Sequence, residues 1–407
     1  MTELSPAWLG EPGVQRLLAA LARAGIEARF VGGCVRDALL GEETGDLDLA
    51  TPARPESVMA ALEAAKIRAL PTGIAHGTVS AIIPPRTFEI TTLRRDVETD
   101  GRHAIVAFGA DWVEDATRRD FTINAIFLAP NGAIYDPVGG QADLGARRVR
   151  FVGDPAIRIA EDVLRILRYY RFEARFGGGE GDAAARAACR GTTGNLLTLS
   201  AERVSRELLR LIGGPDPVRV LTMMRDDGVL AAILPEATRL DRLAAIVRPR
   251  PGIINPAPDR LLRLATLIDV DRAGAIALGA RLQLPAKDRK RLAALAKPWP
   301  IGPDADAKAQ RLALYRIGRD TFLGIVVLFL AERMLPTEKA RDMFALAGRW
   351  EPPVFPVGGD DVTGLGIAPG PRVGQLLGVV RRWWEESDFA ADRAACLARL
   401  KEIAARS

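Results

Sequence analysis

The segment Asp46-Leu47-Asp48-Leu49 carries two carboxylates at a spacing that could hold a metal ion. Successive side chains of a β-strand alternate between its faces, so a strand here turns Asp46 and Asp48 to one face and the two leucines into a core. Two adjacent carboxylates repel each other unless a cation lies between them. Mg²⁺ takes oxygen ligands and keeps waters and substrate phosphates in its shell. The spacing indicates a magnesium site, with a solvated strand end as the open alternative.

A third acidic side chain, Glu89, stands in a β-rich run, where it points away from its apolar neighbours Phe88 and Ile90. It could lie near Asp46 and Asp48 if the two strands pair. An exposed strand residue is the equal alternative.

A pair of glycines, Gly32-Gly33, precedes the carboxylates and follows a short apolar run. We expect a strand, a glycine turn, a helix as far as Leu40, and then the second strand. Backbone N–H groups at Gly33 and the helix start form a site for phosphate oxygens, and Arg36 lies one turn in to pair with them. Turn chemistry alone is the other explanation of the glycines.

A second charged cluster is Arg118-Arg119-Asp120. Arginine donates in a planar fork that suits a triphosphate, and an aspartate accepts from a ribose hydroxyl. Taken alone, the cluster would also fit the capping of a helix end.

A third cluster, Glu161-Asp162-Val163-Leu164-Arg165, could select a base. Cytosine and adenine present an amino donor beside a ring-nitrogen acceptor, whereas uracil and guanine present a carbonyl beside an N–H. A carboxylate beside a guanidinium therefore matches the first two bases and opposes the others. Residues three apart on a helix are neighbours, so we expect Asp162 and Arg165 to form that pair.

Arg168 and Arg171 continue the three-residue spacing. Each step of three rotates the helix face by about 60°, which predicts that Arg171 lies on the far side from Asp162 unless the helix bends. This geometry favours Arg168 as the nucleotide contact and leaves Arg171 to orient carboxylates or to touch RNA phosphate. Surface ion pairs are the alternative for both.

Together these segments resemble a known family. Residues 30–51 closely resemble motif A of the class II tRNA nucleotidyltransferases, which include CCA-adding enzymes and bacterial poly(A) polymerases. Residues 118–125 resemble motif B, residues 161–165 resemble motif D, and residues 201–207 are similar to motif E, a structural helix whose charged pairs brace the nucleotide-binding helix. Residues 361–374 look like a C-terminal segment of bacterial members.

The resemblance implies an α+β protein with a polymerase β-like nucleotidyltransferase domain, followed by all-α domains. It implies that the chain adds CCA to tRNA from CTP and ATP, with two Mg²⁺ on Asp46 and Asp48 as the catalytic carboxylates. The nucleotide-binding residues that we carry over are Gly33, Arg36, Arg119, Asp162, Arg165, Arg168 and Arg171. A poly(A) polymerase, an enzyme that adds only CC or only A, and an inactive RNA-binding protein are the alternatives. No stable protein partner is implied.

Composition fits this reading. The chain has 407 residues, 48% of them hydrophobic and 26% charged, with a net charge of +5. Arginines concentrate between residues 118 and 175, as expected for a phosphate-bearing partner. No apolar run reaches the roughly 20 residues that span a bilayer, and the N-terminus lacks a signal-peptide pattern, so we expect no membrane contact and a cytoplasmic location. Three distant cysteines predict packing roles, and the two histidines exclude histidine-rich metal clusters.

The predicted elements place these clusters on a mixed sheet followed by helices. We expect helices over 14–24, 55–65 and 111–119, hairpins over 78–93 and 124–135, and an irregular loop over 94–109. Beyond residue 150 only helices are expected, including one continuous helix over 154–176 and others over 200–212 and 217–227.

Linkers are expected at 248–258, 298–306 and 352–359. The predicted domains are a head over 1–150, a neck over 151–240, and a body and tail over 241–407. Trp383 and Trp384 are either core residues or a base-stacking platform.

Overall fold

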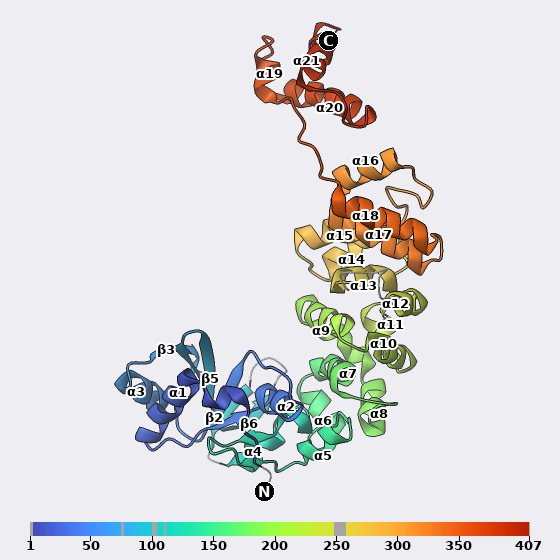
Figure 1. Ribbon diagram of the computed structural model, residues 1–407. Helices are drawn as coiled ribbons and strands as arrows, with labels where there is room; N and C mark the ends of the chain where they lie inside the picture. Colours follow the sequence, from blue (N-terminus) through green and yellow to red (C-terminus); the bar gives the residue numbers. More distant parts are fainter. Residues whose placement is uncertain (1–2, 75–76, 100–103, 110, 248–257, 407) are drawn as a thin grey trace. The chain divides into compact units, whose positions relative to one another are not determined.

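The computed structural model describes residues 3–74, 77–99, 104–109, 111–247 and 258–406. It divides the chain into two compact units, Met1–Pro235 and Glu236–Ser407 (Figure 1). The finer division into head, neck, and body with tail stays a prediction.

The first unit contains a mixed sheet, as predicted. Its seven strands are ordered β3-β4-β5-β2-β1-β8-β9. The central pair β2 and β5 runs parallel, and the other neighbours run antiparallel. The strands are β1 Arg29–Val31, β2 Leu47–Thr51, β3 Arg68–Gly73, β4 Thr78–Ile83, β5 Arg86–Thr92, β8 Phe127–Leu128 and β9 Ile134–Tyr135.

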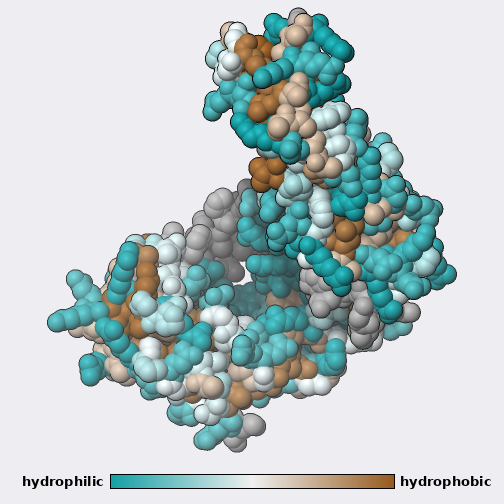
Figure 2. Space-filling model, turned by 45° about the horizontal axis from the view of Figure 1, so that its top comes forward, coloured by the Kyte–Doolittle hydropathy of each residue, from teal (hydrophilic) through white to brown (hydrophobic). Residues whose placement is uncertain are grey.

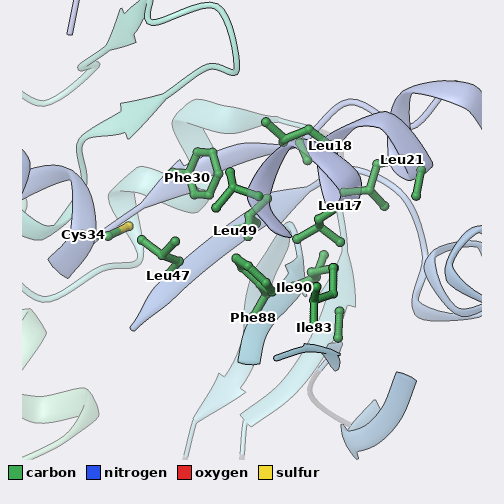
Figure 3. Packing of buried hydrophobic residues seen from close by; sticks show 14 of the residues in the cluster. Leu17, Leu18, Leu21, Phe30, Cys34, Leu47, Leu49, Ile83, Phe88 and Ile90 are labelled. Atoms are coloured by element: carbon green, nitrogen blue, oxygen red, sulfur yellow. The ribbon is translucent and has the colours of Figure 1, made fainter. Parts of the chain in front are cut away.

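One face of this sheet packs against helices α1 (Pro12–Arg23) and α3 (Pro55–Ala64), each of which begins with a proline. Leu17 and Leu21 of α1 are almost fully buried there. They lie close to strand residues such as Leu49 and Phe88 (Figure 3). The alternation of buried leucines with aspartates at the start of β2 is therefore set by this core, and it determines which way the carboxylates face.

The predicted loop over 94–109 is wrong. Strands β6 (Arg94–Thr99) and β7 (Ala104–Phe108) form a separate two-stranded antiparallel sheet. The β-branched residues Val97, Thr99, Ile105 and Val106 favour this conformation, although the polar residues between them hide the pattern in the sequence. The backbone N–H of Gly109 donates to the Leu93 carbonyl, which fixes the end of β7 near the main sheet.

The rest of the first unit is helical. Its further helices are η1 Ala7–Gly10, α2 Gly33–Leu39, α4 Trp112–Thr117, η3 Thr122–Asn124, α5 Gly140–Gly145, α6 Pro155–Glu161, α7 Leu164–Phe176, α8 Ala183–Gly191, η4 Thr193–Thr198, α9 Ala201–Gly213, α10 Pro217–Asp226 and α11 Val229–Ile233. The hairpins around residues 84–85 and 131–132 are confirmed.

The helix predicted over 154–176 is interrupted. It starts as expected, because Asp154 caps α6 at Pro155, but Asp162 adopts an extended backbone with φ −152° and ψ 106°. The Asp162 carboxylate then accepts a hydrogen bond from the Leu164 N–H at the start of α7. Aspartate competes for backbone N–H groups in this way, which makes it a good residue for starting a helix and a poor one inside it.

The second unit consists of helices among its described residues. They are α12 Leu240–Val247, α13 Arg260–Leu267, α14 Arg272–Arg281, α15 Ala286–Leu295, α16 Ala307–Ile317, α17 Arg319–Ala331, α18 Thr337–Arg349, α19 Gly359–Thr363, α20 Pro371–Glu386 and α21 Arg393–Arg406. The expected linkers at 298–306 and 352–359 fall mainly between helices, whereas most of the one at 248–258 lies outside the described residues.

A core near the C-terminus decides the role of the tryptophan pair. Trp384 is 2% exposed and packs with Val380, Cys396 and Leu400, and Trp383 packs against the same cluster. The core alternative is therefore correct for Trp384, and its ring is not free to stack on a base. All three cysteines are buried and unpaired, as expected of packing residues.

Hydrophilic side chains predominate on the face drawn in Figure 2, with small hydrophobic areas between them. Across the described ranges, no helix combines the length and the apolar character that a membrane crossing requires.

Candidate active site

The carboxylate pair lies where the sequence placed it, at the start of β2. Asp46 is exposed, Asp48 is half-buried, and Leu47 and Leu49 are buried. Glu89 lies opposite Asp48 in the parallel register of β2 and β5, and its side chain is exposed. It is therefore both an acidic group beside Asp48 and an exposed strand residue.

Electrostatics at this strand suit a cation. Burial, followed by the charges of Glu89 and Asp46, raises the pKa of Asp48 to about 6, and the positive charge of Arg119 opposes the rise only in part. Oxygen donors with uncompensated negative charge are what a hard divalent cation requires. Among the residues that the structure describes, no three histidine, cysteine, aspartate or glutamate side chains are gathered as ligands. The donor set that fits is thus the pair Asp46 and Asp48.

The glycine turn has a specific backbone requirement. Gly32 has φ 80° and ψ −127°, a conformation that side chains with a Cβ rarely adopt. This turn lets α2 begin directly after β1, so that Gly33 and Arg36 face the interior of the site. The helix has only seven residues, so the positive charge at this point comes from arginine side chains more than from the helix end.

Arg36 is held rigidly. Its side chain is buried, donates to the Asp37 carboxylate, and lies over the rings of Phe176 and Phe172. It also donates to the Asn124 side-chain carbonyl at 2.5 Å. This network fixes the orientation of the guanidinium before any ligand arrives.

Two further arginines share one carboxylate. Asp115 of α4 is almost fully buried and pairs with both Arg118 and Arg119. Burial raises the pKa of Asp115, but the two arginines outweigh it, so the net pKa lies below its ordinary value. One negative charge between two positive ones leaves an excess that attracts anions.

Asp120 links this cluster to α7. Its carboxylate accepts from Arg168 and from the Asn124 amide, the latter at 3.0 Å. Burial raises the pKa of Asp120, yet Arg168 and Asn124 outweigh burial and the net pKa is lowered. Asn124 thus bridges Arg36 and Asp120, and it joins α2 to α7.

These side chains surround one cavity of about 540 Å³. Eight arginines and two aspartates line it. The lining residues are Gly32, Gly33, Arg36, Arg118, Arg119, Asp120, Asn124, Asp162, Leu164, Arg165, Arg168, Arg171, Phe172, Arg175, Phe176 and Arg203. All seven residues expected to bind a nucleotide are among them. Asp46 and Asp48 are not part of the lining. Arg119 connects the cavity to them, because it lines the cavity and its positive charge lowers the pKa of Asp48.

Asp162 and Arg165 line the same cavity, as expected of neighbours, but they are not bonded to each other. Arg165 donates to Glu161 and to the backbone carbonyls of Arg158 and Arg118. The Asp162 carboxylate is instead 2.7 Å from the Arg203 guanidinium on α9. The two side chains do not meet directly because the expected continuous helix is broken at Asp162.

The expectation that Arg171 lies on the far side is wrong, for the same reason. The rotation was counted from a residue that is not in the helix, and Arg171 lines the same cavity as Arg168. Arg171 pairs with Glu207 of α9, so its predicted association with a carboxylate is present. Helix α9 packs against α7 and holds its charged side chains, as expected of a bracing helix.

Five charged or polar lining residues were not among the nucleotide-binding residues selected from the sequence: Arg118, Asp120, Asn124, Arg175 and Arg203. Arg118 and Asn124 stand inside a recognised motif, so proximity to Arg119 and Asp120 could have flagged them. Arg175 continues the series on α7, four residues after Arg171. Arg203 is 41 residues away from Asp162, and no local pattern connects them.

Comparisons with known proteins agree with this geometry. Residues 28–150 match a family described as the poly A polymerase head domain, and residues 182–240 match one described as a probable RNA and SrmB-binding site of polymerase A. The chain is 32% identical over 405 residues to the CCA tRNA nucleotidyltransferase 1, mitochondrial, of Mus musculus, covering 96% of this chain and 90% of the relative. This chain belongs to the class II tRNA nucleotidyltransferase family of CCA-adding enzymes.

Bacterial members of the family are similar as well. The CCA-adding enzyme of Geobacillus stearothermophilus is 37% identical over 237 residues, which is 57% of each chain. A crystal structure of the Bacillus stearothermophilus CCA-adding enzyme in complex with CTP has a TM-score of 0.77 and 28% identity, covering 97% of this chain and 98% of that one. The likeness extends over nearly the full length of a CCA-adding enzyme.

Proposed function

We propose that this chain completes tRNA 3′ ends by adding C, C and A in turn, with CTP and ATP as donors and pyrophosphate as the product. The observation that carries the proposal is the cavity lined by eight arginines and two aspartates. Such a wall binds a triphosphate without using the metal site, and it contains groups that can distinguish bases. The family relationship supports tRNA as the acceptor.

The triphosphate is assigned to the arginines near the glycine turn. Gly33, Arg36 and Arg119 lie on this side of the cavity, and Arg36 and Arg119 are held by Asp37 and Asp115. Preorganised donors cost little reorganisation when charge develops on the leaving pyrophosphate. Arg168 and Arg171 line the wall from α7, so they are assigned to the nucleotide as well.

Asp46 and Asp48 are assigned to catalysis, at the N-terminal end of the central strand β2 and near Arg119. A magnesium ion bound there would lower the pKa of the attacking 3′-hydroxyl and offset charge on the leaving group. Asp46 and Asp48 would hold this ion, and Arg119, which lines the cavity and lies near enough to affect Asp48, would hold the triphosphate beside it. What supports two-metal chemistry here is that Asp46 and Asp48 offer carboxylate oxygens, which are the ligands that Mg²⁺ prefers.

Asp162 is assigned to base recognition, because its carboxylate lines the cavity and accepts N–H donors of the kind that cytosine and adenine carry. Arg165 lines the same wall. Replacing Asp162 with alanine is expected to relax base choice more than it weakens tRNA binding.

The proposed domains follow from these assigned roles. A head over 1–150 would carry the catalytic carboxylates, a neck over 151–240 would select the nucleotide, and a helical body and tail over 241–407 would bind tRNA. The two family matches end at residues 150 and 240, which supports these boundaries. We place the activity in the cytoplasm, although the Mus musculus relative is named as mitochondrial.

The test uses purified protein, Mg²⁺, labelled CTP or ATP, and tRNA transcripts ending before CCA, after C, or after CC. Stepwise addition that stops at CCA is the expected result. A long ladder with ATP alone would assign a poly(A) polymerase, addition of only CC or only A would assign a specialist, and binding without any transfer would assign an inactive RNA-binding protein.

The catalytic assignment is tested with Asp48→Ala and Asp48→Asn, which should abolish incorporation and leave tRNA binding intact. Asp226→Asn is the matched control, because Asp226 is a half-exposed residue of α10 that does not line the cavity. Turnover by the Asp48 variants would overturn the assignment.

A further inference from the structure

The two carboxylates of the candidate metal site are held in place by different means. Asp48 lies within β2, where Leu47 and Leu49 are buried and the strand pairs with β5. Asp46 precedes the first paired residue of β2, and its side chain is exposed. Strand pairing and core packing therefore fix the direction of Asp48, whereas Asp46 needs another constraint if it is to share a cation with Asp48.

The segment in front of Asp46 is a loop. The Glu42 N–H donates to the Asp37 carbonyl at 2.9 Å, which closes the turn after α2, and the ladder of β2 begins only after Asp46. The Thr44 hydroxyl donates to the Asp46 carbonyl at 3.2 Å, but this bond lies within the loop and moves with it. Residues 43–46 therefore depend on side chains from outside the loop for a fixed position.

Arg86, at the start of β5, provides such a contact. Its guanidinium donates to the Gly45 carbonyl at 2.9 Å. Phe88 lies opposite Leu47 in the parallel register of β2 and β5, and extending this register by two residues brings Arg86 level with Gly45. The Gly45 carbonyl belongs to the same planar peptide group as the Asp46 N–H, and holding one end of a rigid plane holds the other. The bond therefore fixes the peptide from which the Asp46 side chain projects.

Glu11 fixes Arg86 in turn. The two carboxylate oxygens of Glu11 each accept one guanidinium N–H, both at 2.7 Å. A bidentate pair of this kind holds the planar guanidinium in one orientation. Glu11 is itself anchored directly before α1, because its N–H donates to Trp8 and its carbonyl accepts from Gln15. Since the arginine side chain is 22% exposed and the glutamate side chain 37%, the pair contributes geometry more than stability.

We infer that Glu11 and Arg86 are positioning residues for the proposed magnesium site. Through Gly45 they hold the Asp46 carboxylate where it can share a divalent cation with Asp48. This role rests on the proposed function, because it concerns the carboxylates assigned to catalysis. Neither Glu11 nor Arg86 is among the described residues that line the cavity, so their removal leaves the arginines that hold the nucleotide in place. The expected defect is therefore in the metal-dependent step and not in nucleotide binding.

The experiment compares Arg86→Met and Glu11→Ala with the wild type. Methionine keeps an unbranched stem and removes every donor, while Glu11→Ala leaves Arg86 without its anchor. Hydrogen exchange over residues 41–46 is measured without metal or nucleotide, Mn²⁺ affinity is measured by electron paramagnetic resonance without nucleotide, and kcat and KM for CTP are measured with Mg²⁺. Arg16→Ala is the matched control, since Arg16 is exposed and also donates to backbone carbonyls of the first unit, directly after α3.

Arg86→Met should speed exchange over residues 41–46 and weaken Mn²⁺ binding by similar factors, because both depend on the same bond. Loss of one hydrogen bond corresponds to a change of roughly threefold to tenfold. The kcat for CTP incorporation should fall by a similar factor with KM unchanged, and Glu11→Ala should show smaller changes in the same direction. A merely structural role would alter KM together with kcat and would leave the Mn²⁺ affinity of the folded protein unchanged.

A double variant shows whether Arg86 acts through Asp46. Asp46→Asn removes the charge of the ligand, and Arg86→Met added to it should weaken Mn²⁺ binding no further. Additive losses would mean that Arg86 affects the site by another route, and they would overturn the inference. Wild-type exchange over residues 41–46 in Arg86→Met would do the same, as would faster exchange there with unchanged Mn²⁺ affinity. Should Arg86→Met fail to fold, wild-type exchange and Mn²⁺ affinity in Glu11→Ala would overturn it.

The proposed function can fail separately. A wild type that adds no nucleotide to any tRNA acceptor, and binds Mn²⁺ no better than Asp46→Asn does, would overturn the metal site together with the inference. A wild type that builds CCA while Arg86→Met keeps wild-type exchange, Mn²⁺ affinity and kcat would overturn only the inference about Glu11 and Arg86.

Discussion

Asn124 is the residue whose removal should most clearly expose how the site is held together. Its side-chain carbonyl accepts from Arg36 on α2, and its amide N–H donates to Asp120, which in turn holds Arg168 on α7. Asn124 is 8% exposed, so water replaces neither bond easily. We predict that Asn124→Ala loosens α2 and α7 together while leaving the second unit unchanged.

The magnitude follows from the partners. A hydrogen bond to a charged group contributes about 1.5–3 kcal/mol. Asn124 makes two, but Arg36 keeps Asp37 and Asp120 keeps Arg168 and the Phe121 N–H, so neither partner is left without compensation. A combined loss of about 2–3 kcal/mol is therefore expected, which corresponds to a roughly thirty- to hundredfold faster local opening at 1.4 kcal/mol per factor of ten.

Hydrogen exchange read by mass spectrometry is the appropriate assay, because the chain has two compact units and a single unfolding midpoint would mix them. Peptides covering α2 and α7 should exchange faster in Asn124→Ala, and peptides from the second unit should not change. Asn195→Ala is the control, since Asn195 is exposed and outside the cavity.

A second variant, Asn124→Asp, separates the two bonds. It keeps an acceptor for Arg36 but places a carboxylate against Asp120, so α7 should open more readily than α2. Unchanged exchange in α7 in both variants would refute the idea that Asn124 couples the phosphate side of the cavity to the neck helix.

Other predictions concern single features of the site. Gly32→Ala should cost about 1–3 kcal/mol because of the positive φ, and it should speed hydrogen exchange in peptides covering β1 and α2, with Gly145→Ala unaffected as the control; unchanged exchange there would contradict the strained turn. Glu207→Gln should raise the KM for CTP severalfold by releasing Arg171, without altering base selectivity in the same rate assay, and a change in selectivity alone would contradict the assignment. Asp115 and Asp120 have lowered pKa values, so their stabilising contribution is complete above the unfolded pKa of about 4 and is lost as the pH falls below it; an acid titration followed by circular dichroism should show helix loss beginning there and a smaller change in Asp120→Asn. Burial raises the pKa of Cys34 and of Cys189 to about 12, so a thiol reagent should label neither in the native protein at pH 8 and both after unfolding.

Local chemistry explains which elements could be predicted. The alternation of Leu47 and Leu49 with the two aspartates, the proline that begins α3, and the Asn-Gly turn at 131–132 each depend on residues within a few positions, and each was predicted correctly. The same short range explains why the arginine-rich clusters could be recognised. Their association in one cavity came from the family resemblance and not from spacing.

The failures also have a physical cause. The break at Asp162 replaces a helical backbone bond with a side-chain bond of similar strength, and periodicity does not distinguish the two. Strand β6 (Arg94–Thr99) is mostly charged, and the apolar run of β7 (Ala104–Phe108) has only five residues, so the sequence of this segment resembles that of a polar loop. Trp384 was ambiguous until the helices around it were placed.

The sequence by itself determined the carboxylate pair, the glycine turn, the change from a mixed sheet to helices near residue 150, and the family. Only the tertiary structure decided which arginine meets which carboxylate. Arginine side chains are long, and this chain offers many acidic partners to each one, so local spacing leaves several ion pairs nearly equal. The packing of α9 against α7 selects among them, and it places Arg203 rather than Arg165 beside Asp162.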